Sequence, residues 1–86
     1  MTSHKLVGMV YNPDVAKAAN ILAELVDSLG LHRRCWSSSV DSTEEIREKL
    51  DKTSLIVVAG GDGTILRTVR ISAPFDVPIV GINMGR

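Results

Sequence analysis

Three short apolar runs and one weaker strand candidate, separated by segments of helical or turn character, divide the chain. Residues 6–11 are mostly apolar and end in an Asn-Pro-Asp turn at 12–14, which predicts a buried strand. Residues 55–59 are apolar throughout, which predicts a strand covered on both faces, as in a parallel sheet flanked by helices. Residues 32–36 are a weaker strand candidate with a loop after it at 37–41, and residues 77–83 contain a fourth strand.

Helical patterns fill the segments between these strands. In residues 14–29 apolar positions recur every three or four residues, and Gly30 stands where a helix C-cap is expected. Ser42 followed by Glu45 has the pattern of a capping box for a short helix that runs to about Leu50. Residues 64–72 predict a third helix, which Pro74 ends. The residues expected on its inner side are Ile65, Leu66 and Val69.

Strands and helices therefore alternate along the whole chain. This alternation implies right-handed crossovers and predicts the α/β class, with a doubly wound, mainly parallel sheet of about four strands and flanking helices. We expect a single domain over residues 1–86, because no linker, internal repeat or low-complexity tract interrupts it. The chain ends directly after a strand-to-loop transition, so we expect this domain to be truncated.

The composition excludes some classes of partner and location but does not indicate a function. The 86 residues allow one small core, and 10 Lys plus Arg balance 10 Asp plus Glu, which gives no electrostatic reason to expect nucleic acid or a membrane as a partner. The single cysteine, Cys35, cannot form an internal disulfide, and no apolar run has the length of a signal peptide core or a membrane span. We therefore expect a cytoplasmic protein.

The clearest chemistry lies in the segment Gly60, Gly61, Asp62, Gly63 and Thr64, between an apolar strand and a helix. Ligands of open α/β sheets bind at the carboxyl ends of the strands. The glycines permit positive φ and keep side chains away from a ligand, and the helix N-terminus offers N–H groups to a phosphate. The threonine can cap the helix or donate its hydroxyl to a phosphate oxygen. A phosphate-binding turn is the favoured interpretation.

Asp62 needs a separate explanation, because a phosphate repels a carboxylate. It can accept a proton from an attacking hydroxyl, bind a sugar by a hydrogen bond, or hold a divalent cation. The alternative is a tight loop in which Asp62 only caps the helix, since short glycine motifs occur widely.

Three segments resemble those of one enzyme family, the NAD kinases, and together they reach from one end of the chain to the other. Residues 57–67 (Val-Val-Ala-Gly-Gly-Asp-Gly-Thr-Ile-Leu-Arg) resemble its diagnostic motif, residues 81–86 (Gly-Ile-Asn-Met-Gly-Arg) its second glycine motif, and residues 7–13 its opening strand. Diacylglycerol-type lipid kinases share the Gly-Gly-Asp-Gly-Thr string but typically continue with Asn-Glu. Phosphofructokinases place a glycine-rich turn after their first strand, where this chain has residues 11–14. Both differences favour NAD kinase.

The resemblance implies the N-terminal domain of the phosphofructokinase/NAD kinase type and transfer of a phosphoryl group from ATP to the 2′-hydroxyl of the adenosine ribose of NAD, giving NADP. It implies that Asp62 is the catalytic carboxylate and contacts NAD together with Gly63. Gly60, Gly61 and Thr64 would help to hold the triphosphate, with a divalent cation such as magnesium.

The same resemblance implies that further residues belong to the site. Arg67 stands where the family has another NAD-contacting basic residue, one helical turn after Gly63, so it could lean back toward the glycine turn; a surface arginine is the open alternative. Gly81, Asn83 and Gly85 would line the same crevice.

The family also has a largely β C-terminal domain with an Asn-Glu or Asn-Asp motif, which this chain lacks, and its full-length members usually form homo-oligomers. We therefore expect the 86-residue chain alone to be inactive. The phosphoryl donor, ATP or polyphosphate, stays open. The alternatives are a non-catalytic α/β nucleotide-binding or regulatory module, or a lipid kinase relative. His4 and His32 have no partner that indicates a catalytic dyad, and Cys35 and Trp36 are expected to pack in the core.

Overall fold

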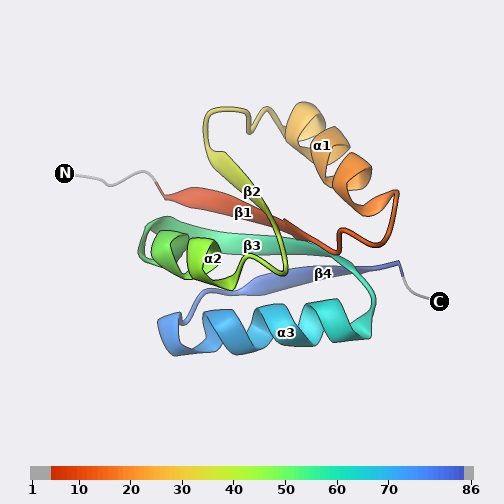
Figure 1. The fold of residues 1–86 in the computed structure, drawn as a ribbon. Helices are drawn as coiled ribbons and strands as arrows, with labels where there is room; N and C mark the ends of the chain where they lie inside the picture. The colour runs from red at the N-terminus through yellow and green to blue at the C-terminus, as the bar shows by residue number, and fades with distance from the viewer. Residues whose placement is uncertain (1–4, 85–86) are drawn as a thin grey trace.

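A four-stranded parallel sheet forms the centre of the computed structural model, which describes residues 5–84 (Figure 1). Its strands are β1 (Leu6–Tyr11), β2 (Cys35–Ser39), β3 (Thr53–Gly60) and β4 (Ile79–Asn83). They lie in the order β2-β1-β3-β4, and each neighbouring pair is parallel. The predicted α/β class and the strand number are confirmed.

The helices cover both faces of this sheet. One face carries α1 (Ala18–Leu29), and the other carries α2 (Thr43–Lys49) and α3 (Asp62–Ser72) (Figure 1). Short 3-10 turns at Leu50–Lys52 and Ala73–Phe75 lead into β3 and toward β4. The chain runs outward from β1 to β2 and then back past β1 to β3, so right-handed crossovers place α1 and α2 on opposite faces.

Successive side chains of the central strands enter two separate cores, as strand geometry requires. Met9 and Ala59 point to the α1 face, where they pack with Ala18 and Leu22. The larger core lies under α2 and α3. Its buried members are Val10, Trp36, Val40, Ile46, Leu50, Ile56, Val58, Ile71 and Val77.

Trp36 fixes the packing of β2 against β1. It is buried, and its Nε1–H donates a 2.9 Å hydrogen bond to Oγ1 of Thr53, which in turn donates to the Lys49 carbonyl. A Cβ atom on Gly8 would lie 2.3 Å from the indole, so only glycine fits beneath the ring. The predicted core packing of Trp36 is confirmed, and Cys35 is half-buried beside it.

Two of the predicted boundaries and one predicted helix cap are wrong. The second strand occupies residues 35–39 instead of 32–36, because its three serines continue the pairing with β1, opposite Met9 to Tyr11, although they give no apolar signal. The first helix begins at Ala18 instead of residue 14, because Asn12 accepts hydrogen bonds from the backbone N–H groups of Asp14 and Val15 and closes a turn there. Ser42 occupies the N-cap position of α2, but its side chain makes no capping hydrogen bond.

Gly30 does end α1 in the left-handed conformation, with φ 66°, as predicted. No helix within residues 5–84 combines the length and the apolar character that crossing a bilayer requires.

Candidate functional site

The carboxyl edge of the sheet brings together the loops that follow β1 and β3. The chain leaves β1 toward β2 and leaves β3 in the opposite direction toward β4, so strand order reverses between these two neighbours. This is the position at which doubly wound sheets bind ligands. The Asn12 N–H donates to the Ala59 carbonyl at 3.1 Å, which ties the first loop to the end of β3.

The glycine turn runs into α3 sooner than predicted. The helix begins at Asp62 instead of Thr64, and Gly61 is its N-cap, with extended backbone and no side-chain cap. Ile65 makes the first intrahelical hydrogen bond, to the Gly61 carbonyl, so the N–H groups of Asp62, Gly63 and Thr64 precede the helical ladder. Neither Asp62 nor Thr64 is the helix cap, which contradicts the alternative that Asp62 only caps the helix and the possibility that Thr64 caps it. The three N–H groups give this end of α3 its partial positive charge.

The glycines of the turn leave room for neighbouring groups and do not adopt unusual dihedral angles. Among the described glycines only Gly30 has positive φ, so the turn does not use the positive φ that its glycines permit. A Cβ on Gly60 would lie 2.8 Å from the Thr64 side chain, whereas a Cβ on Gly63 would meet nothing within 4 Å. Gly60 therefore permits close packing, while the surroundings of Gly63 are open.

The inner face of α3 is polar at three positions. Thr64, Thr68, Ile71 and Ser72 are its buried residues. The Thr68 hydroxyl donates to the Thr64 carbonyl at 2.8 Å, which satisfies that polar group inside the core.

Two of the predicted inner residues of α3 lie elsewhere. Leu66 is 50% exposed and Val69 is 40% exposed, so the prediction that they face inward is wrong, while Ile65 is half-buried against the core. Since Thr64 packs directly on Gly60, the helix is rotated so that its threonines, and not its leucine, meet the sheet.

Asp62 and Asn83 come from the two glycine motifs and meet at the start of α3. The Asn83 side-chain amide donates to Oδ1 of Asp62 at 2.5 Å. Both residues are exposed. In the sheet Asn83 is the register partner of Gly60, and the Met84 N–H donates to the Gly60 carbonyl at 2.7 Å. The structure thus joins, by one direct contact, two residues that the sequence placed near the same crevice.

Arg67 points to a partner that the sequence did not indicate. Its guanidinium lies 3.0 Å from the Asp41 carboxylate, in the loop after β2, and both side chains are more than half exposed. Asp41 follows β2, so this partner comes from a loop at the same carboxyl edge of the parallel sheet as the glycine turn. A 26-residue separation and an isolated loop aspartate leave no sequence signal for such a pair.

Gly81 and Gly85 complete the set of predicted residues. A Cβ on Gly81 would lie 3.0 Å from Ile65, so this glycine lets α3 approach β4. Gly85 lies outside the described residues, as does His4. His32 does have a partner, since its Nε2 lies 2.6 Å from the Asp27 carboxylate on the surface, at the end of the sheet opposite the glycine turn.

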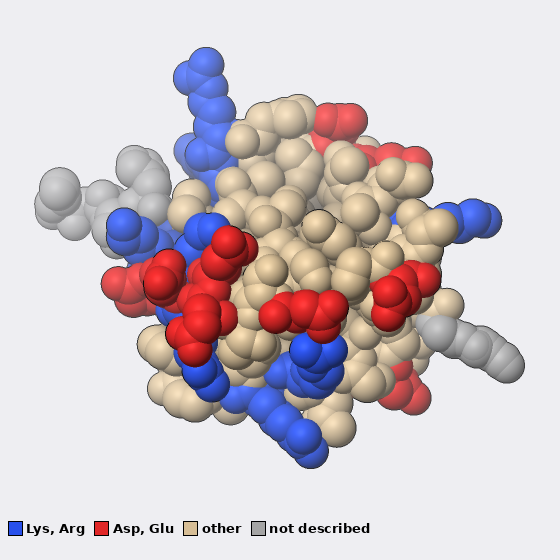
Figure 2. All heavy atoms as spheres, viewed as in Figure 1, with Lys and Arg blue, Asp and Glu red and all other residues tan. Residues whose placement is uncertain are grey.

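The face drawn in Figure 2 carries charges of both signs, and the described residues offer no cluster of metal ligands. Acidic and basic side chains lie next to one another over α2 and α3 (Figure 2). Within residues 5–84 no group of three or more His, Cys, Asp or Glu side chains could hold a metal ion. The described residues therefore do not fit a metal centre built from protein ligands alone.

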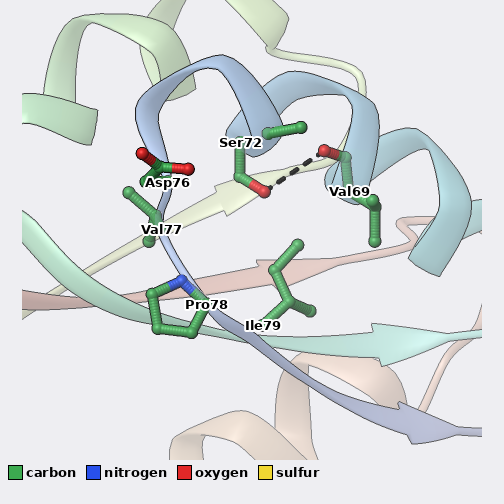
Figure 3. A pocket seen from close by; sticks show the side chains of 7 residues that line it. Val69, Ser72, Asp76, Val77, Pro78 and Ile79 are labelled. Carbon is green, nitrogen blue, oxygen red and sulfur yellow. Dashed lines mark hydrogen bonds between the residues drawn. The ribbon is translucent and has the colours of Figure 1, made fainter.

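An open hollow of about 480 Å³ lies at the far end of α3 (Figure 3). Its lining residues are Val69, Ser72, Ala73, Asp76, Val77, Pro78 and Ile79. They come from the C-terminal half of α3, the segment before β4 and the first residue of β4, whereas Asp62 begins that helix, so the hollow is separate from the glycine turn.

Comparison with known proteins gives the family. The ATP-NAD kinase N-terminal domain family matches residues 31–86. Proteins named NAD kinase from Dehalococcoides mccartyi (strain BAV1) and Heliobacterium modesticaldum are 38% and 39% identical over 96% and 93% of this chain, which spans only 30% and 31% of their length.

A solved structure described as a candidate diacylglycerol kinase from Bacillus anthracis has the same fold, with a TM-score of 0.69 and 26% identity over 99% of this chain and 32% of that one. The resemblance read from the two glycine motifs is confirmed by the family match, and the chain belongs to the ATP-NAD kinase family.

Proposed function

We propose that the chain is the N-terminal nucleotide-binding part of an enzyme that transfers a phosphoryl group from ATP to the 2′-hydroxyl of the adenosine ribose of NAD, giving NADP. The observation that carries this proposal is the contact between Asp62 and Asn83 at the N-terminus of α3, in a chain of the ATP-NAD kinase family. Because the chain spans about 30% of its relatives, the other wall of the nucleotide site would belong to the rest of the protein.

Asp62 is the proposed catalytic residue. One carboxylate oxygen accepts the Asn83 amide, and the other would accept the ribose hydroxyl and take its proton late in the reaction. Phosphoryl transfer requires little covalent chemistry from the protein, so correct placement of the hydroxyl would provide most of the rate enhancement.

The phosphates would lie against the start of α3. Gly60, Gly61 and Thr64 would hold the triphosphate, with the Thr64 N–H as donor because its side chain is buried. Magnesium would enter with ATP as part of the substrate, since this cation is usually held by phosphates and one or two carboxylates. Asp62 and Gly63 would contact NAD.

Arg67 and the second motif would complete the proposed site. Arg67 would contact NAD after release from Asp41, and Gly81, Asn83 and Gly85 would form the edge of the crevice along the end of β4. A cytoplasmic setting is part of the same proposal.

The test compares Asp62→Asn with Asp51→Asn in the full-length protein, with NADP formation as the readout. Asp51 is an exposed carboxylate in the 3-10 turn before β3, which makes it a matched control. Asp62→Asn should abolish turnover without changing the circular dichroism spectrum, and Asp51→Asn should keep it. Near-normal turnover of Asp62→Asn would overturn the assignment.

The choice of acceptor tests the lipid kinase alternative, which the structural likeness to the Bacillus anthracis protein favours. Assays with ATP or polyphosphate as donor and with NAD, NADH or diacylglycerol as acceptor should give product only from the nicotinamide nucleotides. Phosphorylation of diacylglycerol in place of NAD would support the alternative.

A further inference from the structure

We propose that Asn83 is a positioning residue, which holds the Asp62 carboxylate in its reactive orientation instead of binding nucleotide itself. This inference rests on the proposed function and deepens it. The starting observation is the 2.5 Å hydrogen bond from Asn83 Nδ2 to Asp62 Oδ1. It is a charge-assisted contact between an amide donor and a carboxylate, the stronger class of hydrogen bond.

Backbone pairing between β4 and β3 fixes the position of Asn83. Asn83 is the last residue of β4 and pairs in register with Gly60, the last residue of β3. The Met84 N–H closes this end of the ladder by donating to the Gly60 carbonyl at 2.7 Å. Since α3 begins two residues after Gly60, the amide of Asn83 reaches the carboxylate of Asp62 without any mobile connection.

Close packing of α3 against β4 fixes the other partner. Gly81 and Asn83 lie on the same face of β4, because side chains two residues apart on a strand share a face. A Cβ on Gly81 would lie 3.0 Å from Ile65, so the absence of a side chain lets the first turn of α3 lie near the strand. The glycine of the second motif thus allows the contact that its asparagine makes.

The direction of the hydrogen bond explains why an asparagine at position 83 suits the Asp62 carboxylate. The amide nitrogen donates and cannot remove the carboxylate's negative charge, so it can orient Asp62 and leave one of its oxygens for a hydroxyl. An aspartate of the same shape would place a second negative charge against Asp62. An alanine would release the carboxylate without repelling it.

The experiment compares Asn83→Asp and Asn83→Ala with the wild-type full-length protein, measuring kcat and the KM values for NAD and ATP. We expect kcat to fall by roughly tenfold to a hundredfold in Asn83→Ala and further in Asn83→Asp, with both KM values within about threefold of wild type. A higher KM at unchanged kcat would overturn the proposal in favour of a nucleotide contact. A larger loss in Asn83→Ala than in Asn83→Asp would overturn it in favour of simple packing.

The double variant Asp62→Asn with Asn83→Asp provides a readout that needs no activity. It reverses the hydrogen bond, so it should recover the thermal stability that Asn83→Asp loses while staying inactive. Additive losses of stability would contradict a direct contact. A wild-type protein that forms no NADP would overturn the proposed function and this inference with it, whereas an active wild type with unchanged kcat in Asn83→Asp would overturn the positioning role alone.

Discussion

Gly60 and Thr64 lie so close that a Cβ atom at Gly60 would be 2.8 Å from the Thr64 side chain. Gly60→Ala should therefore lower the free energy of unfolding by about 1–3 kcal/mol, the usual cost of overpacking a core. The penalty should be smaller in a Thr64→Ala background, because two of the three nearest atoms, Oγ1 and Cγ2, are then absent. Urea unfolding of the four proteins measures this coupling, and equal penalties in both backgrounds would show that the contact does not limit packing.

Gly63, three residues along the same turn, should respond with the opposite sign. It lies in the first turn of α3 and a Cβ there would meet nothing within 4 Å, so Gly63→Ala should raise stability by about 0.5–1 kcal/mol through helix propensity. If this glycine leaves room for NAD, the same change should lower NADP formation. A variant that is more stable and fully active would remove Gly63 from the proposed binding site.

Part of the fold could be predicted from the sequence, and part could not. Strands with long apolar runs, such as β1 and β3, were predicted because burial on both faces leaves a strong signal in composition. The serines of β2 left none, since that strand is defined by its pairing with β1. The rotation of α3 was missed for a related reason. Three of its four buried residues are polar, with Thr64 packed on Gly60, and apolar patterning cannot reveal a polar contact surface.

The candidate site could likewise be predicted only in part. The place of the glycine turn after a buried strand could be predicted, because parallel strands bring their carboxyl ends to one edge. The hydrogen bond between Asp62 and Asn83 depends on the register of β4 against β3, and the pairing of Arg67 with Asp41 depends on the rotation of α3. Register and rotation are tertiary properties that no local spacing encodes.

The hydrogen bond from Trp36 to Thr53 should support the core under α2. Thr53→Val keeps the shape but leaves the buried indole N–H without its partner, which should cost about 1–3 kcal/mol of unfolding free energy. Ser54→Ala, at the exposed neighbouring position, should change stability by less than about 0.5 kcal/mol. Thermal unfolding followed by the fluorescence of Trp36 checks both, and equal effects of the two changes would contradict the role of Thr53.

Variants of the Arg67–Asp41 ion pair can show whether Arg67 has only a structural role or also binds NAD. Both side chains are exposed, so Arg67→Ala and Asp41→Asn should each change stability by no more than about 1 kcal/mol. If Arg67 contacts NAD, its loss should raise the KM for NAD roughly tenfold, the value of one charge-assisted hydrogen bond. Asp41→Asn should leave that KM unchanged or lower, because it frees the guanidinium. An unchanged KM in Arg67→Ala would identify a surface arginine.

Experiments on the isolated 86-residue chain can distinguish part of an enzyme from a complete binding module. Its Asp62 and Asn83 are exposed, and the chain spans about 30% of its relatives, so ATP and NAD would meet one wall of a site only. We expect no measurable NADP formation and weak binding, because an open surface excludes little water and leaves the phosphate contacts screened. Calorimetric titration with each nucleotide measures this, with Asp62→Asn as the control for binding at the turn. Tight, saturable binding by the isolated chain would favour the non-catalytic module, since that function needs nothing beyond these residues.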